Sequence, residues 1–191
     1  KPFAVLYPSI ERLEQDLQVT EEEKKELKCV QSPIVIISSK NFSGKLCVDH
    51  IASGLGHLGI MLPYSAILQL LTEALQIPII ATSGNVHGSP ILSENRKALE
   101  ELAGVADYFV QHHLEIRNPQ DDSVIKFSPK YRHRIVFRRS RGFAPGYFGE
   151  IASNGEKILA LGAHLKSSVS FLPNDHLHIS QYLGNLDSAQ G

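Results

Sequence analysis

The sequence predicts a mixed α/β (α+β) fold. Short runs rich in Ile, Leu and Val, at 33–38 and 57–62, have the length and composition of buried strands. Apolar residues recur at helical spacing elsewhere in the chain, most clearly over 64–75. Because helices and strands are mixed along the chain, a purely β protein is excluded.

The first half of the chain is expected to alternate between helices and strands. A strand over 3–7 precedes a helix that Ser9 caps and that runs to about Gln18. Thr20 and Glu23 have the spacing of a capping box and predict a second helix. The segment 40–56 has no clear period and predicts a loop. After the 64–75 helix we expect a strand over 77–81, and then a helix that Ser93 starts and Gly104 closes.

The second half is expected to contain short strands. They are predicted at 107–110, 123–127 and 134–138. Gly and polar residues at 152–156 predict a boundary between a domain at 1–151 and the start of a second domain at 157–191. Segments 158–161, 167–172 and 176–180 predict a β-meander, with a turn at Pro173-Asn174-Asp175.

Composition excludes several classes of protein. The 19 basic residues nearly balance the 20 acidic ones, so there is no overall attraction to nucleic acid or to an anionic membrane. No apolar run approaches the roughly 20 residues of a membrane helix. Cys29 and Cys47 are not part of a C-x-x-C pair, which predicts neither a zinc site nor a disulfide framework. Two reduced thiols indicate a cytoplasmic protein.

The first candidate site is Thr82-Ser83-Gly84-Asn85, directly after a predicted buried strand. Ligands of open α/β sheets bind at the carboxyl ends of strands, and Gly allows a phosphate to approach the backbone closely. Ser and Asn side chains provide short hydrogen-bonding groups. A plain turn would use the same residue types, so both interpretations stay open.

Two further candidates come later in the chain. Asp121-Asp122-Ser123 opens a strand, and its carboxylates suit Mg²⁺ on a triphosphate or an amide-like substrate; a solvated acidic turn is the alternative. Arg138-Arg139-Ser140-Arg141 predicts a strand end on which Arg139 and Arg141 share one face and clamp phosphate. An exposed basic edge that prevents aggregation is the alternative. The sequence predicts no metal site: His112 and His113 are adjacent in an extended segment and face opposite ways.

Seven short segments stand out when they are taken in order. They are KPFAV at 1–5, LGIMLPY at 58–64, ATSGN at 81–85, DDSV at 121–124, RRSRGFAP at 138–145, LALGAHLK at 159–166 and SQYLGNLD at 180–187. Together they resemble the HypF-type carbamoyltransferases of [NiFe]-hydrogenase maturation. The first five resemble that family's YrdC-like domain, and the last two resemble the start of the domain that follows it.

The resemblance implies a YrdC-like twisted mixed sheet with flanking helices, followed by the first strands of an actin/sugar-kinase-like domain. It implies that ATP, with Mg²⁺, activates carbamoyl phosphate as carbamoyl-adenylate, and that the carbamoyl group passes to the C-terminal cysteine of the partner HypE. The residues expected to bind nucleotide or carbamoyl groups are Lys1, Thr82, Ser83, Asn85, Asp122, Ser123, Arg139 and Arg141.

The same resemblance implies that this chain is part of a longer protein. The beginning of the YrdC-like domain and the family's zinc and iron sites are expected outside it, so activity is expected of the whole protein rather than of the fragment. Two alternatives stay open. One is a YrdC-type synthase that makes threonylcarbamoyl-adenylate for tRNA modification, and the other is a non-catalytic RNA-binding module.

Overall fold

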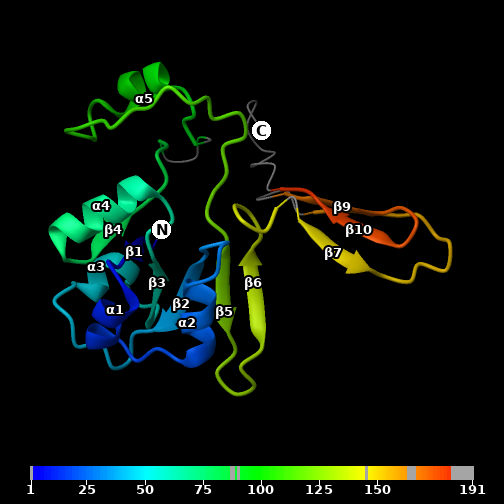
Figure 1. The fold of residues 1–191 in the computed structure, drawn as a ribbon, viewed down its shortest axis with the longest axis horizontal. Coiled ribbons are helices and arrows are strands. Elements are labelled where there is room, and N and C mark those ends of the chain that lie inside the picture. The colour runs from blue at the N-terminus through cyan, green and yellow to red at the C-terminus, as the bar shows by residue number, and fades with distance from the viewer. Residues whose placement is uncertain (1, 87–88, 90, 145, 163–166, 182–191) are drawn as a thin grey trace. The chain divides into compact units, whose positions relative to one another are not determined.

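The computed structural model describes residues 2–86, 89, 91–144, 146–162 and 167–181 (Figure 1). The chain divides into two compact units. The first consists of Lys1–Thr82 and Asp122–Gly142, and the second of Ser83–Asp121 and Phe143–Gly191. The expected boundary at 152–156 stays a prediction. Of the seven motifs, Lys1, Pro145, residues 163–166 and residues 182–187 lie outside the described residues.

A six-stranded sheet, with the strand order β4-β1-β3-β2-β5-β6, forms the centre of the first unit. It is mixed, because β1 pairs with β3 and β2 with β5 in parallel while the other pairs are antiparallel. The predicted mixed α/β class is confirmed. The strands are β1 Ala4–Leu6, β2 Ile34–Ser38, β3 His57–Met61, β4 Ile79–Ala81, β5 Val124–Phe127 and β6 Arg134–Arg138.

The first two helices begin at the predicted caps. In α1 (Ile10–Asp16), the Ser9 hydroxyl accepts a hydrogen bond from the Arg12 N–H at 3.2 Å. In α2 (Glu21–Leu27), Thr20 and Glu23 form the expected capping box. Both predictions are confirmed, because a cap depends only on residues three apart in the sequence.

The core of the first unit forms where these helices pack on the sheet. Alternate residues of β2, Val35 and Ile37, are 0% and 1% exposed. The cluster also takes side chains from α1, α2, β1, β3 and α3 (Val48–Ala52); its buried members are Val5, Tyr7, Ile10, Leu13, Leu17, Leu27, Val35, Ile37, Ile51, Ala52, Leu58 and Ile60. The remaining helix of this unit, α4 (Ala66–Leu75), starts at Ser65 and ends at Gln76 in the left-handed conformation.

The second unit contains α5 (Asn95–Leu102) and a four-stranded antiparallel sheet in the order β7-β10-β9-β8. Asn174 and Asp175 have φ values of 49° and 65° and form the tight turn between β9 and β10. Positive φ at both central residues matches the twist of a two-residue hairpin, so the predicted meander and turn are confirmed. The strands are β7 Tyr147–Glu150, β8 Ile158–Leu161, β9 Val169–Leu172 and β10 His176–Ile179.

Four local predictions were wrong or incomplete. The expected loop 40–56 contains α3. The 107–110 segment forms no strand. Its Tyr108 is 91% exposed, which shows that the apolar side chain does not pack on a sheet. Helix α5 has Glu94 rather than Ser93 as its N-cap, and Gly104, which follows its C-cap Ala103, is not in the left-handed conformation. Strand β7 was missed, because it is short and is completed only by pairing with β10, whose paired residues lie 26 and 31 positions further along the chain.

Among the described residues, no helix has both the length and the apolar character that a membrane crossing requires. The described side chains also contain no group of three or more His, Cys, Asp or Glu placed to hold a metal ion.

Candidate functional site

The loop after β4 is organised by its own polar side chains. The Ser83 hydroxyl donates to Asn85 Oδ1 at 2.5 Å. The Asn85 amide donates to the carbonyl oxygens of Val86 and Ser89, each at 2.9 Å. Thr82 is exposed, whereas Ser83 and Asn85 are partly buried. The two amide protons of Asn85 are therefore used to hold the loop in shape.

This arrangement limits how the loop can bind a phosphate, which offers mainly hydrogen-bond acceptors. Asn85 has no amide proton left over for such a ligand. The Ser83 hydroxyl can turn from Asn85 toward a ligand because rotation about the C–O bond is easy. Asn85 thus shapes the loop and orients Ser83, which is the better candidate for direct contact.

A second cluster lies where β2 and β5 begin and β6 ends, and we call it the arginine junction. The parallel pairing of β2 with β5 and the antiparallel pairing of β5 with β6 bring these three strand ends together. The arginine junction consists of Gln31, Ser32, Tyr64, Asp122, Ser123, Ser140, Arg141 and Gly142.

Ser123 joins two strands of the arginine junction. Its side chain is fully buried; the hydroxyl donates to the Arg141 carbonyl oxygen at 2.9 Å and accepts from the Ser140 N–H at 2.8 Å. A serine has one hydroxyl proton, and here it is used inside the protein. Ser123 therefore has a structural role in this cluster, and its predicted contact with a ligand stays a prediction.

Arg141 binds the protein through both edges of its guanidinium group. Nε and Nη2 donate to Asp122 Oδ1 at 3.0 and 2.7 Å. Nη2 also donates to the Ser32 carbonyl oxygen at 3.0 Å, and Nη1 reaches that of Gln31 at 3.5 Å. The guanidinium carbon lies 3.7 Å from the centre of the Tyr64 ring. A bidentate phosphate contact needs one of these two-pronged edges, and both are occupied.

The other two arginines of the run lie just before Arg141. Arg138 donates from Nε to the Asp122 carbonyl oxygen at 2.6 Å, and partial burial lowers the pKa of the Arg139 guanidinium. Strand β6 ends at Arg138, and Arg141 forms only an isolated bridge to Asp122. The expectation that Arg139 and Arg141 lie within a strand was therefore wrong, and the alternation from which a shared face was predicted stops before both of them.

Gly142 allows the arginine junction to close. Its φ is +88°, and a Cβ at this position would lie 2.6 Å from the Gln31 carbonyl oxygen and 2.8 Å from its Cα. Only glycine combines a left-handed backbone with so close an approach. The turn after Arg141 is consequently pressed against the chain that leads into β2.

The structure brings three of the predicted site residues together, with Arg139 next to them in the sequence, and describes Thr82, Ser83 and Asn85 elsewhere. Asp122, Ser123 and Arg141 meet in the arginine junction. Thr82 follows β4, which is separated from β5 by β1, β3 and β2, and the strand directions place Thr82 at the opposite end of the sheet. Ser83 and Asn85 are described within the second unit, and Lys1 is outside the described residues.

Sequence reasoning missed Tyr64, Gln31 and Ser32 as members of the arginine junction. Tyr64 belongs to the LGIMLPY segment, so its position in a motif was the available signal. Gln31 and Ser32 act through their main-chain carbonyl oxygens, which every residue has. No sequence signal identifies such contacts in advance.

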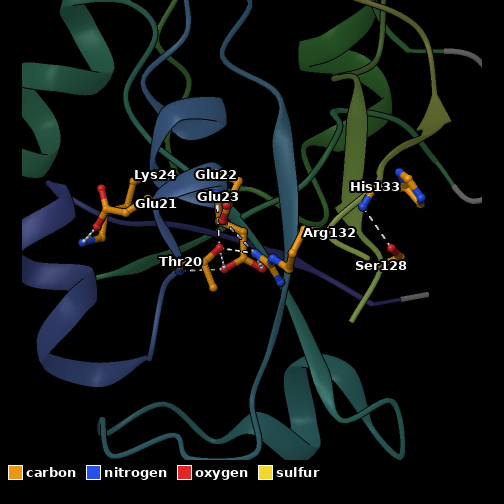
Figure 2. Close-up of polar contacts among 8 residues, drawn as sticks. All are labelled: Thr20, Glu21, Glu22, Glu23, Lys24, Ser128, Arg132 and His133. Carbon is orange, nitrogen blue, oxygen red and sulfur yellow. Dashed lines mark hydrogen bonds and ion pairs between the residues drawn. The ribbon is translucent and has the colours of Figure 1, made fainter. Parts of the chain in front are cut away.

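A cavity of about 330 Å³ lies at the other end of β2. Figure 2 shows part of its wall, where the Arg132 guanidinium points toward Thr20, Glu22 and Glu23. The Thr20 N–H and hydroxyl in turn bind Glu23 Oε2 at 2.9 and 3.0 Å. These polar groups bind one another, and none of the predicted site residues lines this cavity. Its lining residues are Gln18, Val19, Thr20, Glu23, Ile37, Ser38, Lys40, Asn41 and Arg132.

Comparison with family models assigns both parts of the chain. Residues 1–140 match the Sua5/YciO/YrdC family, whose description is "Telomere recombination". Residues 153–191 match the HypF Kae1-like domain.

Whole-chain relatives carry the HypF name. A probable carbamoyltransferase HypF of Methanocaldococcus jannaschii is 38% identical over 186 residues, which are 97% of this chain and 24% of the relative. The carbamoyltransferase HypF of Synechocystis is 34% identical over 189 residues, which are 99% of this chain and 24% of the relative. The chain thus spans about a quarter of the length of the curated relatives it matches.

Solved structures give the same result. HypF of T. kodakarensis superposes over the whole chain with a TM-score of 0.87 at 37% identity, and the match covers 24% of that structure. A full-length HypF in its phosphate- and nucleotide-bound form matches the whole chain with a TM-score of 0.86 at 35% identity, covering 25% of that structure.

A Sua5 of P. abyssi, solved with L-threonine, matches less closely. It covers 73% of this chain and 40% of its own length, with a TM-score of 0.59 at 22% identity. At that identity the match shows a shared fold only. Since the family models, the relatives and the HypF structures agree along the sequence, the chain belongs to the HypF family and spans a Sua5/YrdC-like domain and the start of the Kae1-like domain.

Proposed function

We propose that this chain is the part of a HypF-type carbamoyltransferase that binds ATP and activates the carbamoyl group. The observation that carries the proposal is the match of the whole chain to a HypF structure in a phosphate- and nucleotide-bound form. In the proposed reaction, water hydrolyses carbamoyl phosphate to carbamate and inorganic phosphate. A carbamate oxygen attacks the α-phosphorus of ATP, the bond from that phosphorus to the pyrophosphate oxygen breaks, and carbamoyl-adenylate and pyrophosphate form.

Catalysis of this step is proposed to depend on positioning and electrostatics. Charge spreads over phosphate oxygens as the leaving pyrophosphate departs, so fixed hydrogen-bond donors and cations lower the barrier. Ser83, in a loop shaped by Asn85, would donate to a phosphate or carbamoyl oxygen. Arg139 would supply positive charge, and the resemblance to HypF also implies ligand contacts for Thr82 and Lys1.

Mg²⁺ would bind together with the triphosphate. Magnesium in nucleotide sites usually takes one or two carboxylates, water and phosphate oxygens. Asp122 fits this role only in part, because its Oδ1 already accepts two hydrogen bonds from Arg141. When bound, the ion would neutralise phosphate charge.

The later step would take place in the full-length protein. We propose that the carbamoyl group passes to the C-terminal cysteine of HypE, for synthesis of the cyanide ligands in [NiFe]-hydrogenase maturation, and that this occurs in the cytoplasm. The start of a Kae1-like domain at 153–191 supports a second domain for this transfer.

The second candidate function is synthesis of threonylcarbamoyl-adenylate, because the chain shares its fold with Sua5. Exchange of labelled pyrophosphate into ATP, measured with the full-length protein, distinguishes the two. We expect exchange that requires carbamoyl phosphate. Exchange that instead requires threonine and bicarbonate would assign the protein to the tRNA-modification reaction.

A further inference from the structure

We propose that Arg141 is a positioning residue. With Asp122 and the ring of Tyr64 it holds segment 139–142 in place and does not itself contact the phosphates. The part that concerns phosphates rests on the proposed function. The part that concerns the segment rests only on contacts within the first unit.

The first argument is the hydrogen bonding of the Arg141 guanidinium. Three contacts of 2.7–3.0 Å, to Asp122 and to the Ser32 carbonyl oxygen, use the only proton on Nε and both protons on Nη2. A guanidinium group can bind an oxyanion in bidentate fashion through either of two edges. Both edges include the same Nη atom, which is Nη2 in Arg141. A phosphate could bind Arg141 in bidentate fashion only by displacing Asp122 or the main chain before β2.

The second argument is the stacking of Arg141 on Tyr64. The guanidinium carbon is 3.7 Å from the ring centre, close enough for a cation–π contact. Burial, followed by the charge of Asp122, raises the pKa of the Tyr64 hydroxyl, so the ring stays neutral at physiological pH. One face of the guanidinium is thus covered by an aromatic ring while its edges are held by oxygen atoms.

The third argument is that contacts of the main chain around Arg141 add to those of its side chain. The Ser140 N–H and the Arg141 carbonyl oxygen both bind the buried Ser123 hydroxyl. Gly142 packs against Gln31 without room for a Cβ. With the side chain bound to Asp122 and Tyr64, the segment is fixed on several sides, and a fixed backbone is what a neighbouring arginine needs to present its charge in one direction.

The test uses the full-length protein and two measurements, hydrogen exchange of the 139–142 amides and binding of ATP with Mg²⁺. Tyr64→Leu removes the stacking ring. We expect faster exchange at Ser140 and ATP binding that is weaker by about three- to thirty-fold, the range of a cation–π contact. Tyr64→Phe keeps the ring and should lie closer to wild type than Tyr64→Leu. The matched control is Tyr131→Leu, since the Tyr131 ring also lies against a cation, Lys130 at 5.0 Å, but outside the arginine junction.

Asp122→Ala distinguishes positioning from direct binding by the sign of its effect, provided that ATP binding is measured without Mg²⁺ so that loss of a metal ligand does not contribute. If Arg141 were a phosphate ligand, removing the carboxylate that competes for it would tighten ATP binding. As a positioning residue, Arg141 loses its anchor, so we expect weaker binding and faster exchange at 139–142. Arg141→Lys keeps the charge but cannot fill both edges, and should be as impaired as Arg141→Ala.

Tighter or unchanged ATP binding in Asp122→Ala, or unchanged exchange in Tyr64→Leu, would overturn the inference. If the wild-type protein binds no ATP, the proposed function fails. The exchange rates would then still decide whether Tyr64 and Asp122 hold the segment.

Discussion

Replacing Gly142 with alanine should loosen the arginine junction by a predictable amount. The left-handed backbone costs a non-glycine residue about 1–2 kcal/mol. The new Cβ would also lie 2.6 Å from the Gln31 carbonyl oxygen, and a neighbouring main chain cannot rotate away as a flexible side chain can. Overpacking of this kind costs about 1–3 kcal/mol. We therefore expect Gly142→Ala to lower the free energy of local opening by about 2–5 kcal/mol in total.

Gly54 provides the matched control. Its φ is +68°, but nothing lies within 4 Å of the position that a Cβ would take, so Gly54→Ala carries the backbone cost without the clash. We expect that control to cost about 1–2 kcal/mol. Hydrogen exchange in the full-length protein measures both effects, at the β2 and β5 amides for Gly142 and at the α3 and β3 amides for Gly54, since exchange reports local opening free energies. Equal effects of the two substitutions would refute the argument that close approach to Gln31 requires glycine.

Three further predictions concern contacts away from the proposed ligand residues. Thr20→Ala removes the N-cap of α2 and should lower the opening free energy of that helix by about 1 kcal/mol, measured by amide exchange, whereas Thr20→Ser should largely preserve it. Glu26→Gln breaks a two-pronged ion pair with Arg134, at 2.7 and 2.8 Å. Because Arg134 is partly exposed, we expect the opening free energy of α2 to fall by no more than about 1 kcal/mol, measured by amide exchange. A larger fall would contradict this reasoning. The hydrogen bonds from Ser153 hold the pKa of Asp175 below its usual range. These bonds therefore stabilise the β9–β10 hairpin fully when the pH is above the ordinary pKa of an aspartate, and the stabilisation is lost as the pH falls through the lowered pKa of Asp175. Hairpin exchange, corrected for the intrinsic effect of pH, should show this acid transition in wild type, and its persistence in Asp175→Asn would exclude Asp175 as the cause.

The sequence by itself determined the parts of this protein that depend on near neighbours. The caps at Ser9 and Thr20 bind groups three residues away, and the Asn174-Asp175 turn takes a conformation that its own side chains tolerate. The order of the seven motifs was enough to place the chain in its family, because such order does not require knowledge of contacts. The predictions for segments 40–56 and 107–110 failed for the opposite reason. The structure of these segments depends on whether a sheet or a core is available to pack against them.

Only the tertiary structure shows which contacts the predicted site residues make within the protein. The arginine run predicted a phosphate clamp, yet pairing of β2 with β5 and of β5 with β6 brings Asp122 and the Ser32 carbonyl oxygen to Arg141. Ser123 is likewise used by groups 17 and 18 residues away. Charge and residue type show which side chains are able to bind a phosphate. Whether their hydrogen-bonding groups are already occupied depends on strand pairing between distant segments, which local sequence does not encode.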